Sequence, residues 1–330
     1  MFNFGIRSFS RLFIGAIASL SASVALAQVP AALSGKTVKI IVPQTAAGAS
    51  DSIARLMAAE LSKRWGISVI VENRPGAGGN IGSDAVAKSA PDGTTWLMSY
   101  SGTHAINPAL YGKMPFDPKK DLAPLASLAT LPFVLVINPQ LPYKTLAEYV
   151  AYAKANPGKI NVSSSGNGSV NHLLNEMLGT AAGIQTSHIP YKGAASALND
   201  VMSGQVQGFY ASAPSVMGQI KSGAVRPLAA AATKRAAALP DVPTFGEAGY
   251  PALAIDSWFA FFVQGATPEE LKSQIHSEIN KVLADPVVVE QLSQRGAATM
   301  STALPVFQKI VDADMETWGK TVRDSGAKID

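Results

Sequence analysis

The chain has 330 residues, 47% of them hydrophobic and 15% charged, which is enough for two globular domains with separate cores and unlike a disordered or fibrous protein. Its formal net charge is only +4 at pH 7, and no basic run is longer than a pair such as Lys119-Lys120, so we expect no nucleic-acid partner. The sequence contains no cysteine, which excludes disulfides, a thiol nucleophile and thiolate-bound zinc.

Residues 1–27 have the pattern of a secretory signal peptide. Arg7 and Arg11 form a basic start, an uncharged apolar stretch follows, and Ala25-Leu26-Ala27 is an A-x-A cleavage site. A membrane anchor would need about 20 strongly apolar residues, whereas several serines interrupt this stretch. The sequence therefore predicts an exported protein whose mature chain begins at Gln28.

Short β-branched runs alternate with helical periodicity from Thr37 onward. This alternation is typical of βα units on a mainly parallel sheet, and so of an α/β fold. The runs predict strands at 38–42, 68–72, 95–99, 134–137, 160–163, 205–210, 226–231 and 258–263.

Apolar residues at three- and four-residue spacing predict helices between and after these strands. The first helix would carry Ile53, Leu56, Leu61 and Trp65 on one face, and others are expected near 173–178, 198–202, 271–283 and 307–322. The clearest helix start is Thr267-Pro268-Glu269-Glu270, which predicts Thr267 as the N-cap and proline at the first helical position.

Four segments rich in Gly, Ser and Thr each follow a predicted strand. They are 43–51 (PQTAAGASD), 73–83 (NRPGAGGNIGS), 100–107 (YSGTHAIN) and 163–172 (SSSGNGSVNH). Ligands of α/β proteins bind at the carboxyl ends of strands, and free amides at helix N-termini favour anions by about 0.3 to 1 kcal/mol each. Several such loops around one crevice would form an anion site without arginine. The simpler alternative is that the small residues only make turns and helix caps.

The glycines of the second segment do not match a dinucleotide-binding fingerprint. That motif needs glycines at its first, third and sixth positions, and Ile81 interrupts the series formed by Gly76, Gly78, Gly79 and Gly82. The sequence also lacks a P-loop. We therefore expect no nucleotide cofactor.

The sequence also lacks a recognisable catalytic or metal-binding motif. The chain has no G-x-S-x-G elbow and no paired metal-ligand spacing, so we expect neither an enzyme nor a metal site. His104 and His172 lie in the glycine-rich segments, where we interpret them as structural. A secreted α/β serine hydrolase that uses Ser164 or Ser165 remains the alternative.

The same segments carry a family likeness over nearly the whole mature chain. The motifs are VPQTAAGASDSIARL, VENRPGAGGNIGSDAVAKSAPDGTT, GTHAINPALYGKMPFDPKKDLAPLASLA, SSSGNGSVNHLLNEML, HIPYKGAASALNDVMSGQVQ, ALPDVPTFGEAGYP and GATPEELKSQIHSEINKVLADP. In this order they resemble the tripartite tricarboxylate transporter substrate-binding proteins, also called the Bordetella uptake gene (Bug) receptors.

The resemblance implies a two-lobed periplasmic binding protein of type II, a Venus flytrap, with a mainly parallel sheet in each lobe. The chain would cross between the lobes near 127–132 and near 252–258. Lobe 1 would then contain residues 28–128 plus 252–330, and lobe 2 residues 129–251.

The resemblance also implies a site in the cleft, where such receptors bind a carboxylate through backbone amides, hydroxyls and water. Carried over by position, the ligand-binding candidates are Thr45, Ala46, Ala47, Gly48, Ala49, Ser50, Asp51, Gly76, Ala77, Gly78, Gly79, Ser101, Gly102, Thr103, Ser164, Ser165, Gly166, Gly168, Ser169, Tyr191, Lys192, Gly193 and Ala211.

Two positions depart from the family pattern. Ala47 stands before Gly48 where many relatives have two glycines, which leaves this backbone less freedom for positive φ. Tyr210-Ala211-Ser212 stands where many relatives place an aspartate, which favours carboxylates without an amine. Lys192 is either a countercharge for a distal carboxylate or a solvated side chain.

The implied function is a periplasmic receptor rather than an enzyme. It would capture a small organic carboxylate as a monomer and deliver it transiently to the subunits of a membrane transporter. A sensor adaptor that signals to a membrane kinase through the same ligand-closed form is the other alternative that the resemblance leaves open.

Overall fold

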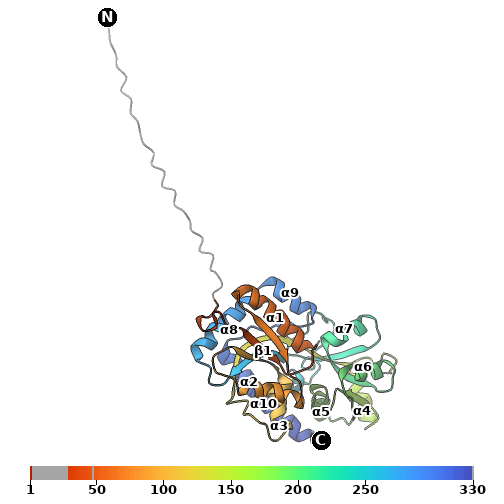
Figure 1. Cartoon of the computed structure of the whole chain (residues 1–330). Helices are drawn as coiled ribbons and strands as arrows, with labels where there is room; N and C mark the ends of the chain where they lie inside the picture. Colours follow the sequence, from red (N-terminus) through yellow and green to blue (C-terminus); the bar gives the residue numbers. More distant parts are fainter. Residues whose placement is uncertain (2–28, 47, 329–330) are drawn as a thin grey trace.

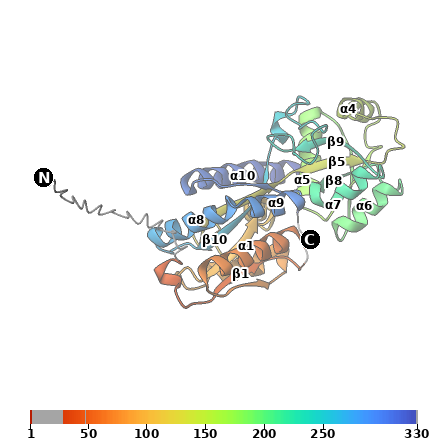
Figure 2. The ribbon, with the colours of Figure 1, turned by 90° about the horizontal axis from the view of Figure 1, so that it is seen from above.

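The computed structural model describes Met1, residues 29–46 and residues 48–328. The rest of the predicted signal peptide, the predicted mature terminus Gln28, and Ala47 of the first glycine-rich loop lie outside the described residues. The described chain forms two lobes that lie side by side, each around its own sheet (Figure 1, Figure 2).

Lobe 1 contains a six-stranded sheet in the order β11-β4-β10-β3-β1-β2. The strands are β1 (Val38–Val42), β2 (Val69–Asn73), β3 (Thr95–Tyr100), β4 (Leu122–Leu131), β10 (Ser257–Gln264) and β11 (Ala298–Thr299). One apolar face packs against α1 (Ala49–Trp65), α8 (Glu269–Leu283) and α9 (Pro286–Gln294). The other face packs against α2 (Asn80–Ala87) and the first half of α10 (Leu304–Ser325).

Lobe 2 contains a five-stranded sheet in the order β7-β6-β8-β5-β9. The strands are β5 (Phe133–Ile137), β6 (Asn161–Ser164), β7 (Ser187–Pro190), β8 (Gly208–Ser212) and β9 (Arg226–Ala231). Helices α4 (Leu146–Ala155) and α5 (Val170–Ala182) cover one face. Helices α6 (Ala194–Met202) and α7 (Ala213–Lys221) cover the other.

Both sheets contain a reversed strand, which corrects the expectation of mainly parallel pairing. Strand β10 runs antiparallel to both β3 and β4, and β5 runs antiparallel to both β8 and β9. The reversal has a topological cause, because β4 leads directly into β5 and the returning chain inserts β10 between β3 and β4. Each sheet is therefore mixed, within the predicted α/β, two-lobed fold.

The chain passes from one sheet to the other at Pro132 and returns between β9 and β10. Ala129 and Thr130 still pair with β11 in the sheet of lobe 1, a little beyond the predicted boundary at residue 128. Helix α10 belongs to both lobes, because Phe307 packs into a core of lobe 1 and Trp318 into a core of lobe 2 (Figure 2). The lobe boundaries drawn from the sequence stay a prediction that these contacts refine.

Two local predictions are wrong. Thr267 does not cap α8, since Pro268 occupies the N-cap position with extended ψ and the buried Thr267 hydroxyl has no described partner. The strand expected from residue 205 begins at Gly208, because the Val206 amide instead donates to the carbonyl of Asp200 in a turn. No helix among the described residues has both the length and the apolar character needed to cross a bilayer.

Candidate functional site

A cavity of about 400 Å³ lies between the lobes, where loops at the ends of strands from both sheets meet. Lobe 1 supplies the segments around Gly78 and from Tyr100 to Tyr111, and lobe 2 supplies the loop between β6 and α5. The full lining is Gly78, Tyr100, Gly102, Asn107, Leu110, Tyr111, Phe133, Ser165, Gly166, Asn167, Gly168, Ser169, Val170, Asn171, Ala194 and Ser212.

Three helices of lobe 2 direct their N-termini at this cavity. Helix α5 begins after Ser169, α6 begins at Ala194 and α7 begins after Ser212, and all three residues line the cavity. The amides of Val170 and Ala194 donate to no acceptor in the described part of the chain. Free amides and helix dipoles make this wall of the cavity favourable for an anion.

The loop between β6 and α5 is held in one conformation by internal hydrogen bonds. Ser165 Oγ donates to Asn171 Oδ1 at 2.5 Å, and Asn171 Nδ2 donates to the carbonyl of Tyr210 on β8. Gly168 has φ of +71°, a conformation that glycine adopts without strain. The loop can therefore present its amides without first having to be ordered.

The wall from lobe 1 is more apolar. Tyr100, Leu110 and Tyr111 line it, and Tyr100 stacks on Phe259 with ring centroids 5.9 Å apart. The side-chain amide of Asn107, which also lines the cavity, is already paired, because its Nδ2 donates to the carbonyl of Gly78 at 3.0 Å. This wall offers surface for an apolar part of a ligand.

A neighbouring cavity of about 430 Å³ shares Ser212 with the first. It is lined by Gly48 and Ala49 at the start of α1, by Pro214 of α7 and by Arg295 after α9. The Arg295 guanidinium donates to Ser52 Oγ at 3.0 Å and to the carbonyl of Gln291 at 2.6 Å.

The structure brings only part of the predicted site together. Gly78, Gly102, Ser165, Gly166, Gly168 and Ser169 line the cavity between the lobes, and Gly48 and Ala49 line its neighbour. The other described candidates line neither cavity: Thr45, Ala46, Ser50, Asp51, Gly76, Ala77, Gly79, Ser101, Thr103, Ser164, Tyr191, Lys192, Gly193 and Ala211.

Several of these other candidates have structural partners. The Asp51 carboxylate accepts from Arg55 at 3.0 Å and from Asn73 at 2.9 Å. The Tyr191 hydroxyl donates to Asp200, and Ala211 packs in a core of lobe 2. These contacts place their side chains in the scaffold of the loops.

Sequence reasoning missed most of the aromatic lining. Tyr100 and Asn107 lie at the two ends of a segment that the sequence singled out, so their position was a usable signal. Tyr111 and Phe133 lie outside every glycine-rich segment. They reach the cavity only because the two lobes fold against each other.

A serine and a histidine lie in contact beside the cavity. Ser164 Oγ is 2.6 Å from His188 Nε2, but the Ser164 side chain is fully buried and also bonds to Gly166. His188 stacks on His172 with ring centroids 3.7 Å apart. Ser164 therefore has no open path to a molecule in the cavity, unlike a nucleophile.

Both rings of this stacked pair are held neutral. His172 Nδ1 accepts the Gly168 amide at 3.1 Å, which places its proton on Nε2. Burial, with a smaller contribution from His188, lowers the pKa of His172 to about 4, and burial also lowers the pKa of His188. The pair supports the loop and adds no positive charge to the site at neutral pH.

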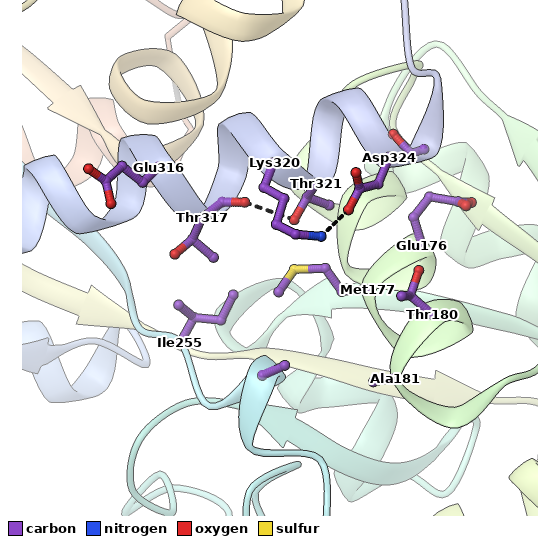
Figure 3. A pocket seen from close by; sticks show the side chains of 12 residues that line it. Glu176, Met177, Thr180, Ala181, Ile255, Glu316, Thr317, Lys320, Thr321 and Asp324 are labelled. Carbon is purple, nitrogen blue, oxygen red and sulfur yellow. Dashed lines mark hydrogen bonds and ion pairs between the residues drawn. The ribbon is translucent and has the colours of Figure 1, made fainter.

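A cavity of about 610 Å³ lies between α5 and α10 (Figure 3). Glu176, Glu316 and Asp324 line it, and Lys320, which also lines it, is paired with Asp324. This concentration of carboxylates would repel an anion. The described residues contain no group of three or more His, Asp or Glu side chains placed to hold a metal ion.

Comparisons with known proteins agree on one family. Residues 53–327 match the family described as "Tripartite tricarboxylate transporter family receptor". Protein BugT of Bordetella pertussis is 34% identical over 315 residues, which cover 95% of each chain. Solved structures of other proteins are also similar, and two of them are described with a carboxylate.

The first structure is R. palustris Rpa4515 with adipate, at 32% identity and a TM-score of 0.78, covering 89% of this chain and 98% of that one. The second is MatC from Rhodopseudomonas palustris with bound malate, at 31% identity and a TM-score of 0.74, covering 87% of this chain and 98% of that one.

Proposed function

The chain belongs to the tripartite tricarboxylate transporter receptor family, and from this premise we propose that it is a solute-binding receptor for a small organic carboxylate. It binds the carboxylate between its lobes and delivers it to the membrane subunits of a transporter of that type. The receptor works in the periplasm. It acts as a single chain, because both walls of the cavity come from its own two lobes.

The observation that carries this proposal is the convergence of α5, α6 and α7 on one cavity. The unpaired amides of Val170, at the start of α5, and Ala194, at the start of α6, lie at the wall of this cavity. None of the described residues that line the cavity has a charged side chain. A carboxylate matches such a wall, since it accepts several hydrogen bonds and is favoured at helix N-termini. Adipate and malate in the two related structures are carboxylates too.

We propose no chemistry on the ligand. The hydrolase alternative needs Ser164 or Ser165 as its nucleophile. Ser164 is fully buried and hydrogen-bonded, and Ser165, which does line the cavity, donates its hydroxyl hydrogen to the side-chain amide of Asn171, which is not a general base. A receptor returns its ligand unchanged and binds one molecule per chain. An enzyme would convert an excess of it.

A thermal-shift screen tests the proposal, with di- and tricarboxylates, aromatic monocarboxylates, acidic amino acids, sugars and polyamines as probes. A carboxylate at about a hundred times its Kd should stabilise the fold by roughly 2.7 kcal/mol by mass action. Mass spectrometry after incubation should recover the ligand unchanged. A melt shifted only by neutral or cationic compounds would contradict the proposal, as would a converted ligand.

A matched pair of variants at Ala194 tests where the carboxylate binds. Ala194 is exposed and is the first residue of α6, so Ala194→Asp should fold normally and place a negative charge at the anion-binding wall. We expect Ala194→Asp to lose at least tenfold in affinity. Ala194→Asn has nearly the same shape without the charge and should keep most of it. Equal affinities of the two variants would move the site elsewhere.

A further inference from the structure

The cavity between the lobes is lined by uncharged side chains. Among the described residues that line it there is no Asp, Glu, Lys, Arg or His. Burial raises the pKa of both Tyr100 and Tyr111, so both hydroxyls stay protonated at neutral pH. A second carboxylate or an ammonium group on the ligand would find no opposite charge in this lining.

The two lobes contribute different groups to the lining of the cavity. The unpaired amides at the starts of α5 and α6 belong to lobe 2. At the start of α2 in lobe 1, by contrast, the Gly79 and Ile81 amides both donate to the carbonyl of Gly76. The N-termini of α5 and α6 therefore make lobe 2 the anion-binding wall of the cavity.

Half-buried aromatic rings also line the cavity. Tyr100 and Tyr111 lie with Leu110 on the lobe 1 side, and Phe133 at the start of β5 adds a ring from lobe 2. Tyr100 is fixed by its stacking on Phe259, and the Tyr111 hydroxyl lies so near Gly78 that a Cβ there would be only 2.3 Å away. The rings form a preformed apolar surface, which favours offset or edge contacts with another ring.

We infer that the preferred ligand is an aromatic monocarboxylate, with its carboxylate at the N-termini of α5 and α6 and its ring against Tyr100, Tyr111 and Phe133. This inference rests on the proposed function, since it names the class of carboxylate that the same cavity selects. It separates this chain from the relatives with adipate and malate, which are dicarboxylates.

Isothermal titration with benzoate and four close analogues tests the inference. Benzamide removes the charge, terephthalate adds a second carboxylate, 4-(aminomethyl)benzoate adds an ammonium group, and acetate removes the ring. We expect benzoate to bind at least tenfold more tightly than each analogue, because each lacks the charge or the ring or brings a charge without a partner. Succinate and aspartate serve as aliphatic comparisons and should bind more weakly still.

Variants at Tyr111 test the role of the aromatic wall. Tyr111→Phe keeps the ring and should bind benzoate within about threefold of the unchanged protein. Tyr111→Ala removes the ring and should lose roughly tenfold for benzoate with little change for acetate. A melting curve for each variant shows whether it is folded, and Phe133→Ala provides a second removal of a ring if Tyr111→Ala is not.

The outcomes separate the inference from the proposed function. Tightest binding of a dicarboxylate, a tricarboxylate or an amino acid would overturn the inference and leave a carboxylate receptor. An equal loss of benzoate and acetate affinity in folded Tyr111→Ala would also overturn it. Failure of every carboxylate to bind would instead overturn the proposed function itself.

Discussion

Replacing Gly168 by alanine tests whether tight binding needs the lobes to meet across the cavity. Gly168 lies in the loop before α5, directly against Leu110 of lobe 1. A Cβ on residue 168 would lie 2.2 Å from one terminal carbon of Leu110 and 2.7 Å from the other. The three atoms nearest to the added methyl group all belong to Leu110, so the group obstructs the contact between the lobes.

Two costs combine in Gly168→Ala, and they act on different quantities. Positive φ at an alanine costs roughly 1 to 2 kcal/mol and lowers the free energy of unfolding whether or not ligand is bound. The clash with Leu110 arises only when the lobes meet. Because its nearest atoms are the ends of a partly exposed leucine side chain that can turn aside, we take the low end of the usual overpacking cost, about 1 kcal/mol. That second cost corresponds to a loss of roughly fivefold in ligand affinity.

Gly158 offers a matched control. Its φ of +72° nearly equals that of Gly168, yet a Cβ there would meet no atom within 4 Å. Gly158→Ala should therefore lower the melting temperature in the same way and leave affinity unchanged. The double variant Gly168→Ala/Leu110→Ala should recover the part of the affinity that the clash removed.

Titration calorimetry gives the affinities, and solution scattering with and without ligand gives the radius of gyration. We expect Gly168→Ala to remain more extended than the unchanged protein at the same ligand concentration. The reasoning is refuted if folded Gly168→Ala binds as tightly as Gly158→Ala and contracts to the same radius.

The remaining predictions concern buried titratable groups. Burial raises the pKa of Asp314 from 3.8 to about 6, so its contribution to stability falls as pH rises from about 4 to 6 and then stays constant. Asp314→Asn, which keeps an acceptor for Trp258 Nε1, should raise the free energy of unfolding at pH 8 by up to about 3 kcal/mol and change it little at pH 4. Denaturant melts at both pH values check this, and equal effects would refute it. Burial lowers the pKa of His104 from 6.5 to about 3, so unfolding takes up a proton between these pH values. The free energy of unfolding therefore falls by about 1.4 kcal/mol for each unit by which the pH is lowered from about 6.5 to 3. His104→Phe, which can keep the stacking on Phe262, should flatten the slope in denaturant melts, and an unchanged slope would contradict the assignment.

Elements with strong local periodicity could be predicted from the sequence. The residues 38–42 and 226–231 form strands with the predicted bounds, and the face of α1 that carries Ile53 and Leu61 is buried as the spacing indicated. Strand β4 was missed because its sequence LAPLASLATL is rich in alanine and contains a proline. Long-range pairing with β10 and β11 makes it a strand.

The site could be predicted only as far as local chemistry allows. The loop with Gly166 and Gly168 was identified because glycines at a strand end point to an unusual backbone with accessible amides. Tyr111 and Phe133 carry no such signal, since an isolated aromatic residue normally indicates a core. Their role depends on how the two lobes face each other in the folded protein, which local sequence does not show.

The central claim, that the cavity between the lobes holds an organic carboxylate, is tested most directly by what the protein carries when it is purified. Protein isolated from the periplasm under native conditions should release a small molecule on denaturation, and mass spectrometry should identify it. We predict one unmodified carboxylate per chain, whose readdition raises the melting temperature. A released molecule without a carboxylate that restores the same stability would contradict the account.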